Sequence, residues 1–280
     1  MNIALTGASG FLGRHVLSEL NCREIAPSVV LRGDAGLPDG VSVRHAARFD
    51  IRSAPADAYR QLGEPDTLLH LAWGGLPNYS SLHHYEEELP AQYAFLKSMI
   101  AGGVRNVVVT GTCFEYGMQS GPLPPTAPAR PRNPYGFAKD TLHRQLRFLQ
   151  GELDFNLVWV RLFYPYGEGQ AAGSLYSQLK SAVDQGRPVF DMSGGEQLRD
   201  YMPVEEMARD LVDLSRLGNC DETLNLCSGT PVSVRALVEG WIRSNNWKID
   251  LNLGFYPYSP HEPMAFWGVR APLDRLLSPS

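Results

Sequence analysis

The first residues of the chain constrain its fold more than any other segment. Residues 2–6 form a short apolar run typical of a strand, a turn with Gly7, Gly10 and Gly13 follows, and residues 11–21 have helical spacing. The first glycine permits a tight turn, the second lets the backbone approach a phosphate, and the third lets the helix pack closely on the strand. The N–H groups that open the helix can bind an anion. The segment therefore predicts a dinucleotide-binding turn, although the same spacing without this context also occurs in ordinary loops.

Strand and helix patterns alternate as far as residue 161, which is typical of an α/β protein with a parallel, doubly wound sheet of the Rossmann type. The expected strands cover 2–6, 28–32, 42–45, 66–70, 105–110 and 155–161, and the expected helices cover 11–21, 53–62, 82–102 and 135–151. Beyond Pro165 the elements are shorter and the turns richer in glycine. We predict a dinucleotide-binding domain at 1–164, with a returning segment near 199–228, and a smaller, interleaved C-terminal substrate lobe at 165–198 and 229–280.

Composition excludes several classes of protein. The 280 residues carry a net charge of −5 and no run of Lys or Arg, so a nucleic-acid partner is not expected. No apolar segment is long enough to cross a membrane, and the start of the chain does not read as a secretory signal. The four cysteines, Cys22, Cys113, Cys220 and Cys227, lack the spacing of a zinc or redox site. We expect reduced thiols, no metal site and a cytoplasmic location.

Arg32 follows the second expected strand, at the position where sites for NAD carry an Asp or Glu that binds the ribose 2′-hydroxyl. A guanidinium suits the 2′-phosphate of NADP, because it can bond two phosphate oxygens at once. Asp34 lies two residues later and would supply a carboxylate if the register shifted. The sequence therefore favours NADP(H) and leaves NAD(H) possible, and it leaves open that Arg32 is only a solvated loop charge.

Two further strand ends face the same crevice in such a sheet. Asp50 and Ile51 follow the third expected strand, and Asp50 can either reach the adenine amino group or cap the next helix. Leu71 and Ala72 follow the fourth strand, where a small side chain lets a cofactor pass closely. The predicted cofactor-binding residues are Gly7, Ser9, Gly10, Phe11, Leu12, Gly13, Arg32, Asp50, Ile51, Leu71, Ala72, Tyr135 and Lys139.

Tyr135 and Lys139 lie four positions apart in a segment that predicts the start of a helix. Asn133 is a favourable N-cap and Pro134 a favourable first residue, so the two side chains share one helix face. A neighbouring ammonium and the positive end of the helix dipole both stabilise a phenolate. We expect the pKa of Tyr135 to fall toward the working pH, which suits proton transfer at a carbinol or carbonyl oxygen. A surface Tyr stacked on a Lys stem is the alternative.

Thr112 follows a buried-type strand at 107–110 and stands at its carboxyl end, beside the expected crevice. Its hydroxyl can donate to the oxygen that Tyr135 protonates, or it can bond its own turn, as isolated threonines often do. Thr112, Tyr135 and Lys139 are the predicted catalytic residues.

With these residues the chain resembles the extended short-chain dehydrogenase/reductases, a group of NAD(P)-dependent nucleotide-sugar epimerases, dehydratases and reductases. The resemblance covers nearly the whole chain and rests on segments 6–13, 70–72, 112–117, 134–139, 161–167, 194–201 and 225–229. It implies a Rossmann-type fold, catalysis by Thr112, Tyr135 and Lys139, and a nucleotide-sugar substrate. By analogy with the family, the helices at 82–102 and 135–151 would form a homodimer interface.

The resemblance also implies roles in the substrate site. Lys139 would bind the nicotinamide ribose, and Arg199 would contact the substrate diphosphate unless it only pairs with a carboxylate such as that of Asp200. Trp73 would line the sugar pocket, with core or rim packing as the alternative. The implied substrate-binding residues are Trp73, Thr112, Tyr164 and Arg199.

Departures from the family pattern narrow the implied activity. Sugar 4,6-dehydratases carry an Asp-Glu pair directly after the catalytic Thr, and here Cys113 and Phe114 occupy these positions. Epimerases usually hold NAD with an acidic residue where this chain has Arg32, and their frequent Asn is replaced by Tyr164. Segments 111–117 and 262–268 are most similar to those of reductases of nucleotide-linked 4-keto-6-deoxysugars, which serve deoxysugar and polysaccharide biosynthesis.

This likeness implies NADPH-dependent reduction of a C4 keto group on a nucleotide-activated 4-keto-6-deoxyhexose, with Tyr135 as the acid. An NAD-dependent nucleotide-sugar 4-epimerase is the first alternative. A non-catalytic protein that senses a dinucleotide is the second. The sequence does not show which nucleotide or sugar is bound, or which C4 configuration the product has.

Overall fold

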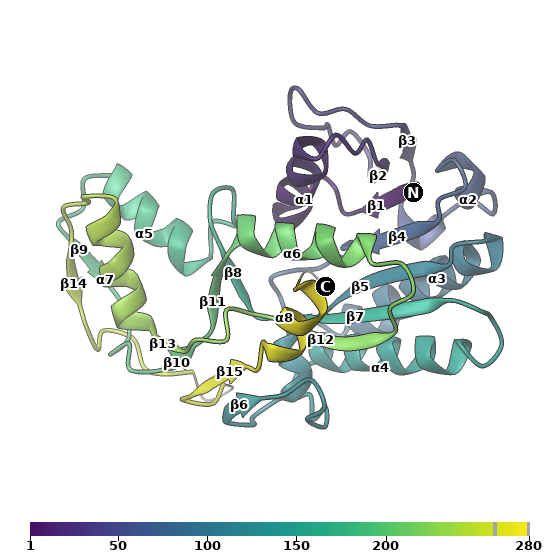
Figure 1. The fold of residues 1–280 in the computed structure, drawn as a ribbon. Helices are drawn as coiled ribbons and strands as arrows, with labels where there is room; N and C mark the ends of the chain where they lie inside the picture. The colour runs from purple at the N-terminus through teal and green to yellow at the C-terminus, as the bar shows by residue number, and fades with distance from the viewer. Residues whose placement is uncertain (260–261, 279–280) are drawn as a thin grey trace.

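The computed structural model describes residues 1–259 and 262–278. Its centre is a seven-stranded sheet in the order β3-β2-β1-β4-β5-β7-β12, and every neighbouring pair runs parallel (Figure 1). The chain starts in the middle of the sheet and winds first toward one edge and then toward the other, so the predicted doubly wound sheet is confirmed. The strands are β1 (Ile3–Thr6), β2 (Ser28–Leu31), β3 (His45–Arg48), β4 (Thr67–His70), β5 (Asn106–Thr112), β7 (Asn156–Leu162) and β12 (Glu222–Leu226).

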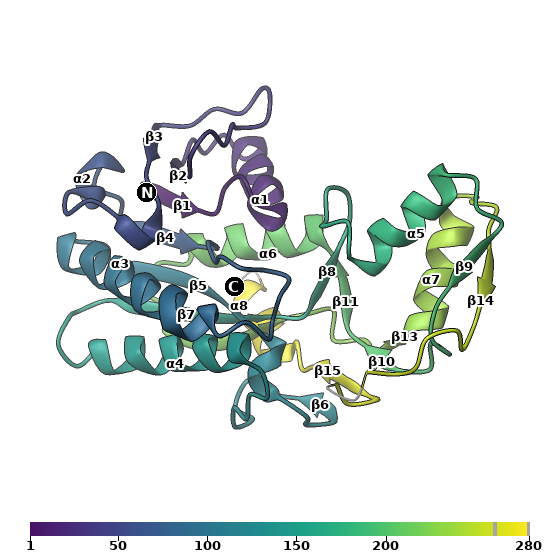
Figure 2. The ribbon, with the colours of Figure 1, turned by 180° about the vertical axis from the view of Figure 1, so that it is seen from behind.

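Alternating side chains place an apolar core on each face of this sheet. On β1, Leu5 packs in the first core and Ala4 in the second. Helices cover both faces (Figures 1 and 2), which is why the strands read as nearly continuous apolar runs. The first core lies under α1 (Phe11–Cys22), α6 (Val204–Arg216) and α8 (Ala271–Leu277), and the second under α2 (Ala58–Gln61), α3 (Leu89–Gly102) and α4 (Pro134–Leu149).

Three short helical turns connect these elements. The 3₁₀ turn η1 (Ile51–Ser53) follows β3, and the 3₁₀ turn η3 (Cys113–Tyr116) follows β5 directly. The π-helical turn η2 (His84–Glu88) runs into α3. The turns η1 and η3 therefore lie at the carboxyl ends of strands β3 and β5.

A smaller lobe, at the left of Figure 1, has an apolar core of its own. Leu179 of α5 (Leu175–Asp184) and Trp241 of α7 (Val234–Ser244) pack in it, together with Phe190 of β9. After β8 the chain enters this smaller lobe, then returns to the central sheet to form β12, and enters the lobe again at α7. The remaining strands pair as β6 (Gly121–Leu123) with β15 (Phe266–Gly268), β8 (Tyr164–Tyr166) with β11 (Tyr201–Pro203), β10 (Leu198–Arg199) with β13 (Val232–Ser233), and β9 (Val189–Asp191) with β14 (Asp250–Asn252).

The domain limits given above stay a prediction. Leu273 of α8 packs in the first core of the central sheet, although the sequence division places it in the substrate lobe. Within the described residues, no helix is long and apolar enough to cross a membrane.

Three elements differ from their expected bounds by more than two residues. The helix expected at 82–102 is the π-helical turn η2 followed by α3, which begins at Leu89. The third strand occupies 45–48 and not 42–45, because the pairing with β2 is set by Ala47, which is buried in the second core beside Val30. The helix expected at 53–62 is reduced to η1 and the four residues of α2. Pro55 explains this, because it lacks an N–H and disfavours a helical conformation in the residue before it.

Candidate active site

The glycine turn joins β1 to α1 in a conformation that suits a bound pyrophosphate. Gly7 has a left-handed backbone (φ +75°), and its carbonyl accepts from the N–H of Gly10 at 3.0 Å. A Cβ on Gly13 would lie 1.9 Å from the carbonyl oxygen of Gly7, so only glycine can be accommodated there. Gly10 is the N-cap of α1 and supplies no side-chain cap. The first N–H groups of the helix therefore stay available to a phosphate.

A cavity of about 200 Å³ lies beside this turn, at the carboxyl ends of β1, β2 and β4. Its walls suit a dinucleotide, because they combine exposed backbone at the glycines, the small side chain of Ala72 and the positive charge of Arg32. The predicted cofactor residues that line it are Gly7, Ser9, Gly10, Arg32, Asp50, Ile51, Leu71 and Ala72. Of the other predicted residues on the turn and α1, Leu12 packs against the first core and Phe11 lines a neighbouring cavity.

Asp50 caps the turn that follows it. Its carboxylate accepts from the N–H of Arg52 at 2.9 Å and forms an ion pair with the Arg52 guanidinium at 2.8 Å. The bond from Arg52 lowers the pKa of Asp50 below its ordinary value, and the positive charge of Arg32 acts in the same direction. The capping alternative is thus what the structure shows, and a contact with adenine stays a prediction.

Thr112 ends β5 and is the N-cap of η3. Its hydroxyl oxygen accepts from the N–H of Phe114 at 3.2 Å, so the bond to its own turn is also present. The hydroxyl proton remains available for donation. The Thr112 side chain acts to lower the pKa of Tyr135, and both residues line one cavity, described below.

Tyr135 lies in the first turn of α4, which begins at Pro134 as predicted. The side chain of the N-cap, Asn133, accepts from the N–H of Gly136 at 2.7 Å. The Tyr135 ring is buried among aromatic rings, with its centre 5.2 Å from that of His84 and 5.5 Å from that of Tyr79.

Burial raises the pKa of Tyr135 well above its ordinary value, and the groups at Tyr79, Glu115 and Cys113 add to this rise. The expected fall in this pKa is therefore wrong. The reason is that desolvation of the phenolate in an apolar environment outweighs the helix dipole and the opposing effect of the Thr112 side chain.

Lys139 lies one turn further along α4 and is buried. Its ammonium donates to the backbone carbonyl of Thr110 at 2.7 Å and lies 4.1 Å from the ring centre of Trp73. It lies 5.9 Å from the ring centre of Tyr135. Burial lowers the pKa of Lys139 to about 7, against the carboxylates of Glu115 and Glu88, which raise it. The ammonium is thus held by a backbone carbonyl and an indole ring.

A second cavity, of about 390 Å³, opens in front of Thr112 and Tyr135. Phe11 also lines it, which places it next to the glycine turn. Cys113, Phe114 and Tyr164 contribute further walls, together with residues of the smaller lobe such as Trp241. Thr112 and Tyr135 therefore share one cavity, and about half of its lining residues are aromatic.

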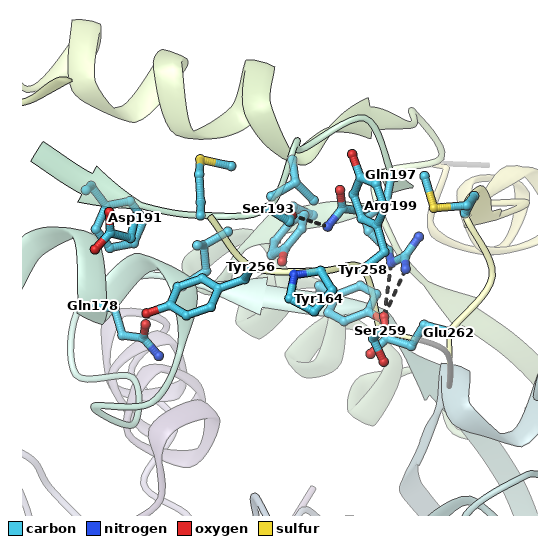
Figure 3. Close-up of a pocket in the computed structure, with 17 residues that line it drawn as sticks. Tyr164, Gln178, Asp191, Ser193, Gln197, Arg199, Tyr256, Tyr258, Ser259 and Glu262 are labelled. Atoms are coloured by element: carbon cyan, nitrogen blue, oxygen red, sulfur yellow. Dashed lines mark hydrogen bonds and ion pairs between the residues drawn. The ribbon is translucent and has the colours of Figure 1, made fainter. Parts of the chain in front are cut away.

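A third cavity, of about 350 Å³, is shown in Figure 3. Tyr164 and Tyr201 line both this cavity and the second one, so the two adjoin. Arg199 of β10 points into the third cavity, where its guanidinium pairs with Glu262 at 3.0 Å. The Glu262 carboxylate also accepts from the Tyr164 hydroxyl at 3.0 Å. A buried cation therefore lies where the second and third cavities meet.

Arg199 forms its ion pair with Glu262 and not with Asp200, the neighbouring carboxylate that the sequence suggested. Asp200 accepts instead from the N–H groups of Ser228 at 2.7 Å and Gly229 at 3.0 Å, and so fixes the loop after β12. Glu262 lies 63 positions from Arg199 along the chain, and only the fold brings the two together.

Comparison with known proteins shows the family. The model of the NAD dependent epimerase/dehydratase family matches residues 3–227. The chain belongs to this family. This confirms the resemblance to the extended short-chain dehydrogenase/reductases, and it makes the chain an enzyme of the NAD-dependent group that modifies nucleotide-sugars.

Individual relatives cover most of the chain. It is 30% identical over 274 residues to the dTDP-6-deoxy-L-talose 4-dehydrogenase (NAD(+)) of Aggregatibacter actinomycetemcomitans, covering 96% of this chain and 100% of that protein. It is 23% identical to the dTDP-4-dehydro-6-deoxyglucose reductase of Escherichia coli, over 85% of this chain and 79% of the relative. Among solved structures, MoeE5 in complex with UDP-glucuronic acid and NAD has a TM-score of 0.83 and 26% identity, covering 99% and 92% of the two chains.

The fold of this family member thus brings together most of the predicted site residues. Thr112 and Tyr135 meet at the second cavity, Lys139 lies behind them, and the glycine turn adjoins them. Trp73 is placed differently from the expectation, because it lines the first cavity and covers Lys139. The first cavity is also lined by seven residues that the sequence did not predict for the cofactor site: Val30, Phe49, Arg52, Trp73, Gly74, Glu88 and Gln92. Val30, Phe49, Arg52, Trp73 and Gly74 lie in a strand or within four residues of its end, and this position is the signal that could have found them.

A cluster of possible metal ligands also lies near the site. Ligand atoms of Glu115, Asp140 and His143 fall within 4.8 Å of one another. The Glu115 carboxylate already accepts from Arg161 at 2.6 Å, and Asp140 pairs with Arg144 at 2.9 Å. The positive charges of Arg161 and Arg144 already balance these carboxylates and would repel a metal ion, so we assign no metal to the cluster.

Proposed function

We propose that this enzyme reduces the C4 keto group of a nucleotide-linked 4-keto-6-deoxyhexose. The observation that carries the proposal is the convergence of Thr112 and Tyr135 on one cavity beside the glycine turn. Cys113 and Phe114, which follow Thr112, offer no acid–base pair for the elimination of water. Two relatives support C4 chemistry, because their names specify a 4-dehydrogenase and a reductase of a 4-dehydro sugar.

The residues of the site can perform this reduction. A bound nicotinamide supplies the hydride. Tyr135 is protonated at neutral pH because burial raises its pKa, and it gives this proton to the C4 oxygen as negative charge develops there. Thr112 donates a second hydrogen bond to the same oxygen and holds it in position. Lys139 binds the nicotinamide ribose and stabilises the phenolate that Tyr135 becomes. A tyrosine that stays protonated favours reduction over oxidation.

We assign the substrate diphosphate to Arg199 and the sugar to the aromatic second cavity. The phosphate oxygens would replace the carboxylate of Glu262 on the buried guanidinium, which is 7% exposed. Tyr164 lies between the two cavities and would contact both halves of the substrate.

The preference for NADP that Arg32 predicts receives no support from the comparisons. The relative with the highest identity given above is named with NAD(+), and the MoeE5 structure contains NAD. Arg32 lines the first cavity beside Asp50 and Arg52, and this cluster of charges is compatible with either cofactor. We therefore propose that the protein uses NAD(P)H, with the preference decided by kcat/KM for NADH against NADPH.

We also propose a homodimer formed through α3 and α4. Phe137 and Phe148 of α4 are 50% and 81% exposed, which is unusual for phenylalanine and typical of a contact surface. Sedimentation of the parent and of Phe148→Glu tests this. The parent should sediment as a dimer and the variant as a monomer, and a monomeric parent would refute the proposal. The cytoplasmic location stays a prediction.

The direct test of the activity uses the purified protein with NADH or NADPH and a dTDP-linked 4-keto-6-deoxyhexose. We expect loss of the nicotinamide absorbance and formation of a 6-deoxyhexose with a hydroxyl at C4. GDP- and CDP-linked 4-keto sugars extend the assay to other nucleotides. If no such substrate oxidises either cofactor, the proposed activity is wrong.

A 4-epimerase is the second candidate, because UDP-glucose 4-epimerases also match the chain. An epimerase keeps its cofactor through the reaction, whereas a reductase must exchange it at each turnover. NAD that remains bound through purification, together with inversion at C4 of a UDP-sugar, would favour this candidate. A sensor without turnover would bind the dinucleotide but convert neither class of substrate.

A further inference from the structure

Glu115 is buried directly behind Thr112. It occupies the third position of η3, and its carboxylate folds back to accept from the N–H of Thr112 at 2.9 Å. The Thr112 hydroxyl in turn accepts from the N–H of Phe114, so the turn is closed by reciprocal bonds in a capping box. Capping carboxylates usually lie at the surface, but the Glu115 side chain is 0% exposed. Burial of this charge needs an explanation, because it costs free energy unless the charge is fully paired.

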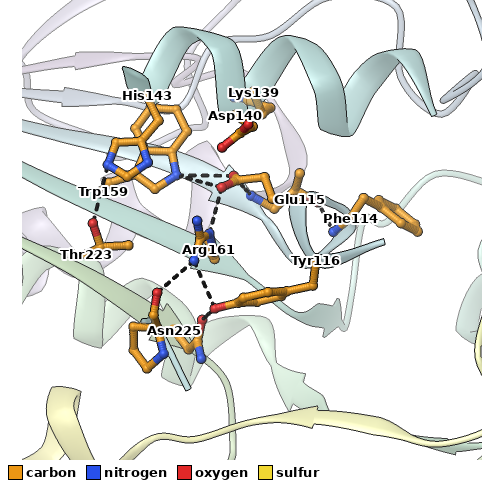
Figure 4. Close-up of polar contacts among 12 residues, drawn as sticks. Phe114, Glu115, Tyr116, Lys139, Asp140, His143, Trp159, Arg161, Thr223 and Asn225 are labelled. Atoms are coloured by element: carbon orange, nitrogen blue, oxygen red, sulfur yellow. Dashed lines mark hydrogen bonds and ion pairs between the residues drawn. The ribbon is translucent and has the colours of Figure 1, made fainter. Parts of the chain in front are cut away.

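Two side chains of β7 pair with this carboxylate (Figure 4). The Nε of Arg161 donates to Glu115 at 2.6 Å, and the indole N–H of Trp159 donates at 3.1 Å. Trp159 and Arg161 are two residues apart on one strand and therefore face the same side of the sheet. Space for them depends on Gly111, where a Cβ would lie 2.3 Å from the Trp159 nitrogen and 2.4 Å from a Glu115 oxygen.

Arg161 is itself held on its other side. Its Nη1 donates to the Tyr116 hydroxyl at 3.1 Å and to the carbonyl of Pro125 at 2.9 Å. The Tyr116 hydroxyl donates to Asn225 of β12 at 2.6 Å. The network thus joins η3 to two strands of the central sheet, and it fixes the orientation of Glu115 from behind (Figure 4).

Stability alone does not account for this ion pair. Exchange of a buried ion pair for apolar side chains of similar volume is often neutral or stabilising. Neither Glu115 nor Arg161 belongs to the walls of the three cavities described above. Their direct link to the site is the hydrogen bond that the N–H of Thr112 donates to the Glu115 carboxylate.

We infer that Glu115, held by Arg161 and Trp159, is a positioning residue that fixes the backbone of Thr112 and thereby aims its hydroxyl at the C4 oxygen of the substrate. This inference rests on the proposed function. The position of the charge supports it, because the Glu115 carboxylate also raises the pKa of Tyr135 and of Lys139. A higher pKa favours the protonated form of each group. Reduction needs the phenol of Tyr135 as proton donor and the ammonium of Lys139 to stabilise the phenolate. Tyr79 and Cys113 act on Tyr135 in the same direction, and so does Glu88 on Lys139.

The decisive experiment compares two double variants that differ only at residue 115. Glu115→Leu with Arg161→Met removes both charges and the acceptor for the Thr112 N–H, whereas Glu115→Gln with Arg161→Met removes both charges but keeps an acceptor. We expect kcat to fall at least about tenfold in the Leu variant and to return to within about threefold of the parent in the Gln variant. KM for the sugar and the cofactor should stay within about twofold of the parent in both variants.

A further cycle tests whether Glu115 acts through Thr112. Thr112→Val should lower kcat in the parent and add little in the Leu variant, because the hydroxyl is no longer aimed there. A matched control removes the ion pair between Arg23 and Asp213, which joins α1 to α6 away from Thr112, and Arg23→Met with Asp213→Leu should leave kcat unchanged. Equal kcat in the Leu variant and the parent, or full additivity with Thr112→Val, would overturn the inference.

Two further measurements keep the inference testable. If the Leu variant does not fold, Glu115→Asp retains the charge but shortens the side chain, so kcat should fall with KM unchanged; a parental kcat would then refute the inference. Amide hydrogen exchange at Thr112 is independent of turnover, and it should be faster in the Leu or Asp variant than in the parent. If the parent converts no nucleotide-linked 4-keto sugar, the proposed function fails, and unchanged exchange at Thr112 would separately refute the contact with Glu115.

Discussion

At the scale of single residues, burial decides the protonation of the two central groups. Tyr135 and Lys139 lie in the same apolar environment, but burial has opposite effects on their pKa values because one group is charged when it loses a proton and the other when it gains one. Both groups are therefore driven toward their neutral forms. A neutral phenol is a proton donor, which is the role that reduction requires.

Replacement of Tyr135 by Phe removes the proton donor and keeps the ring. We expect kcat to fall by about 10²- to 10⁴-fold, the usual contribution of a general acid. The dissociation constant of the cofactor should stay near that of the parent, because the glycine turn is untouched. A Phe variant with parental kcat would exclude Tyr135 as the acid. Steady-state kinetics and a fluorescence titration with NADH measure the two quantities.

Lys139 makes a prediction about stability and pH that does not depend on turnover. Its pKa is lowered to about 7 in the folded protein from the ordinary 10.5, so above about pH 7 the unfolded chain binds more protons at this residue. Burial of the charged Lys139 therefore lowers the free energy of unfolding most below pH 7, and this loss shrinks as the pH rises toward the ordinary pKa of 10.5. Between about pH 7 and 9, the free energy of unfolding of the parent should rise relative to that of Lys139→Met. A constant difference across this range in urea titrations would contradict the lowered pKa.

At the scale of elements, the β1–turn–α1 unit was predictable because its geometry is local. Gly7 needs a left-handed backbone, and Gly13 must approach the Gly7 carbonyl, so glycine at these positions specifies the turn. The start of α4 is local in the same way, since Asn133 and Pro134 provide an N-cap and a first helical residue. The third strand was misplaced because its register depends on a partner strand and on which small side chain packs in the core.

Gly13→Ala tests the turn. The added methyl group would overlap the Gly7 carbonyl oxygen, and the helix must shift away from the strand. We expect a loss of about 1–3 kcal/mol of stability and a clear loss of cofactor affinity. The matched control is Gly240→Ala in α7, where nothing lies within 4 Å of the new Cβ. The control should be stabilised by up to about 1 kcal/mol, because alanine is the better helix former. Unchanged NADH affinity in Gly13→Ala would argue against pyrophosphate binding at this turn.

At the scale of the whole molecule, the fold assembles the site from distant segments. The second cavity combines walls from the central sheet with residues from the smaller lobe, which the chain enters twice, and the third cavity adjoins it through Tyr164 and Tyr201. Arg199 comes from β10 and Glu262 from near the C-terminus, and Tyr164 accompanies them from β8. A substrate with a sugar at one end and a charged diphosphate beyond it would extend across both cavities.

Arg199→Met tests this arrangement by removal of the buried cation. We expect KM for the nucleotide-sugar to rise at least about tenfold and kcat to change less than about threefold, because the guanidinium would bind the diphosphate and not the reacting carbon. Arg235→Met on the surface of α7 is the matched control and should leave both constants unchanged. A lower kcat with an unchanged KM would place Arg199 in the chemical step and not in substrate binding.

The sequence by itself determined the fold family and the glycine turn, and it predicted Thr112, Tyr135 and Lys139 as the catalytic groups. The glycine turn and the start of α4 are carried by short segments with obligatory local geometry, and the family is indicated by several such segments together. Only the tertiary structure decided the environment of these groups: the raised pKa of Tyr135, the place of Lys139 beneath Trp73, the pairing of Arg199 with Glu262, and the buried support of Thr112 by Glu115 and Arg161. Desolvation and ion pairing depend on every neighbour in space, and those neighbours come from strands and loops far apart in the chain.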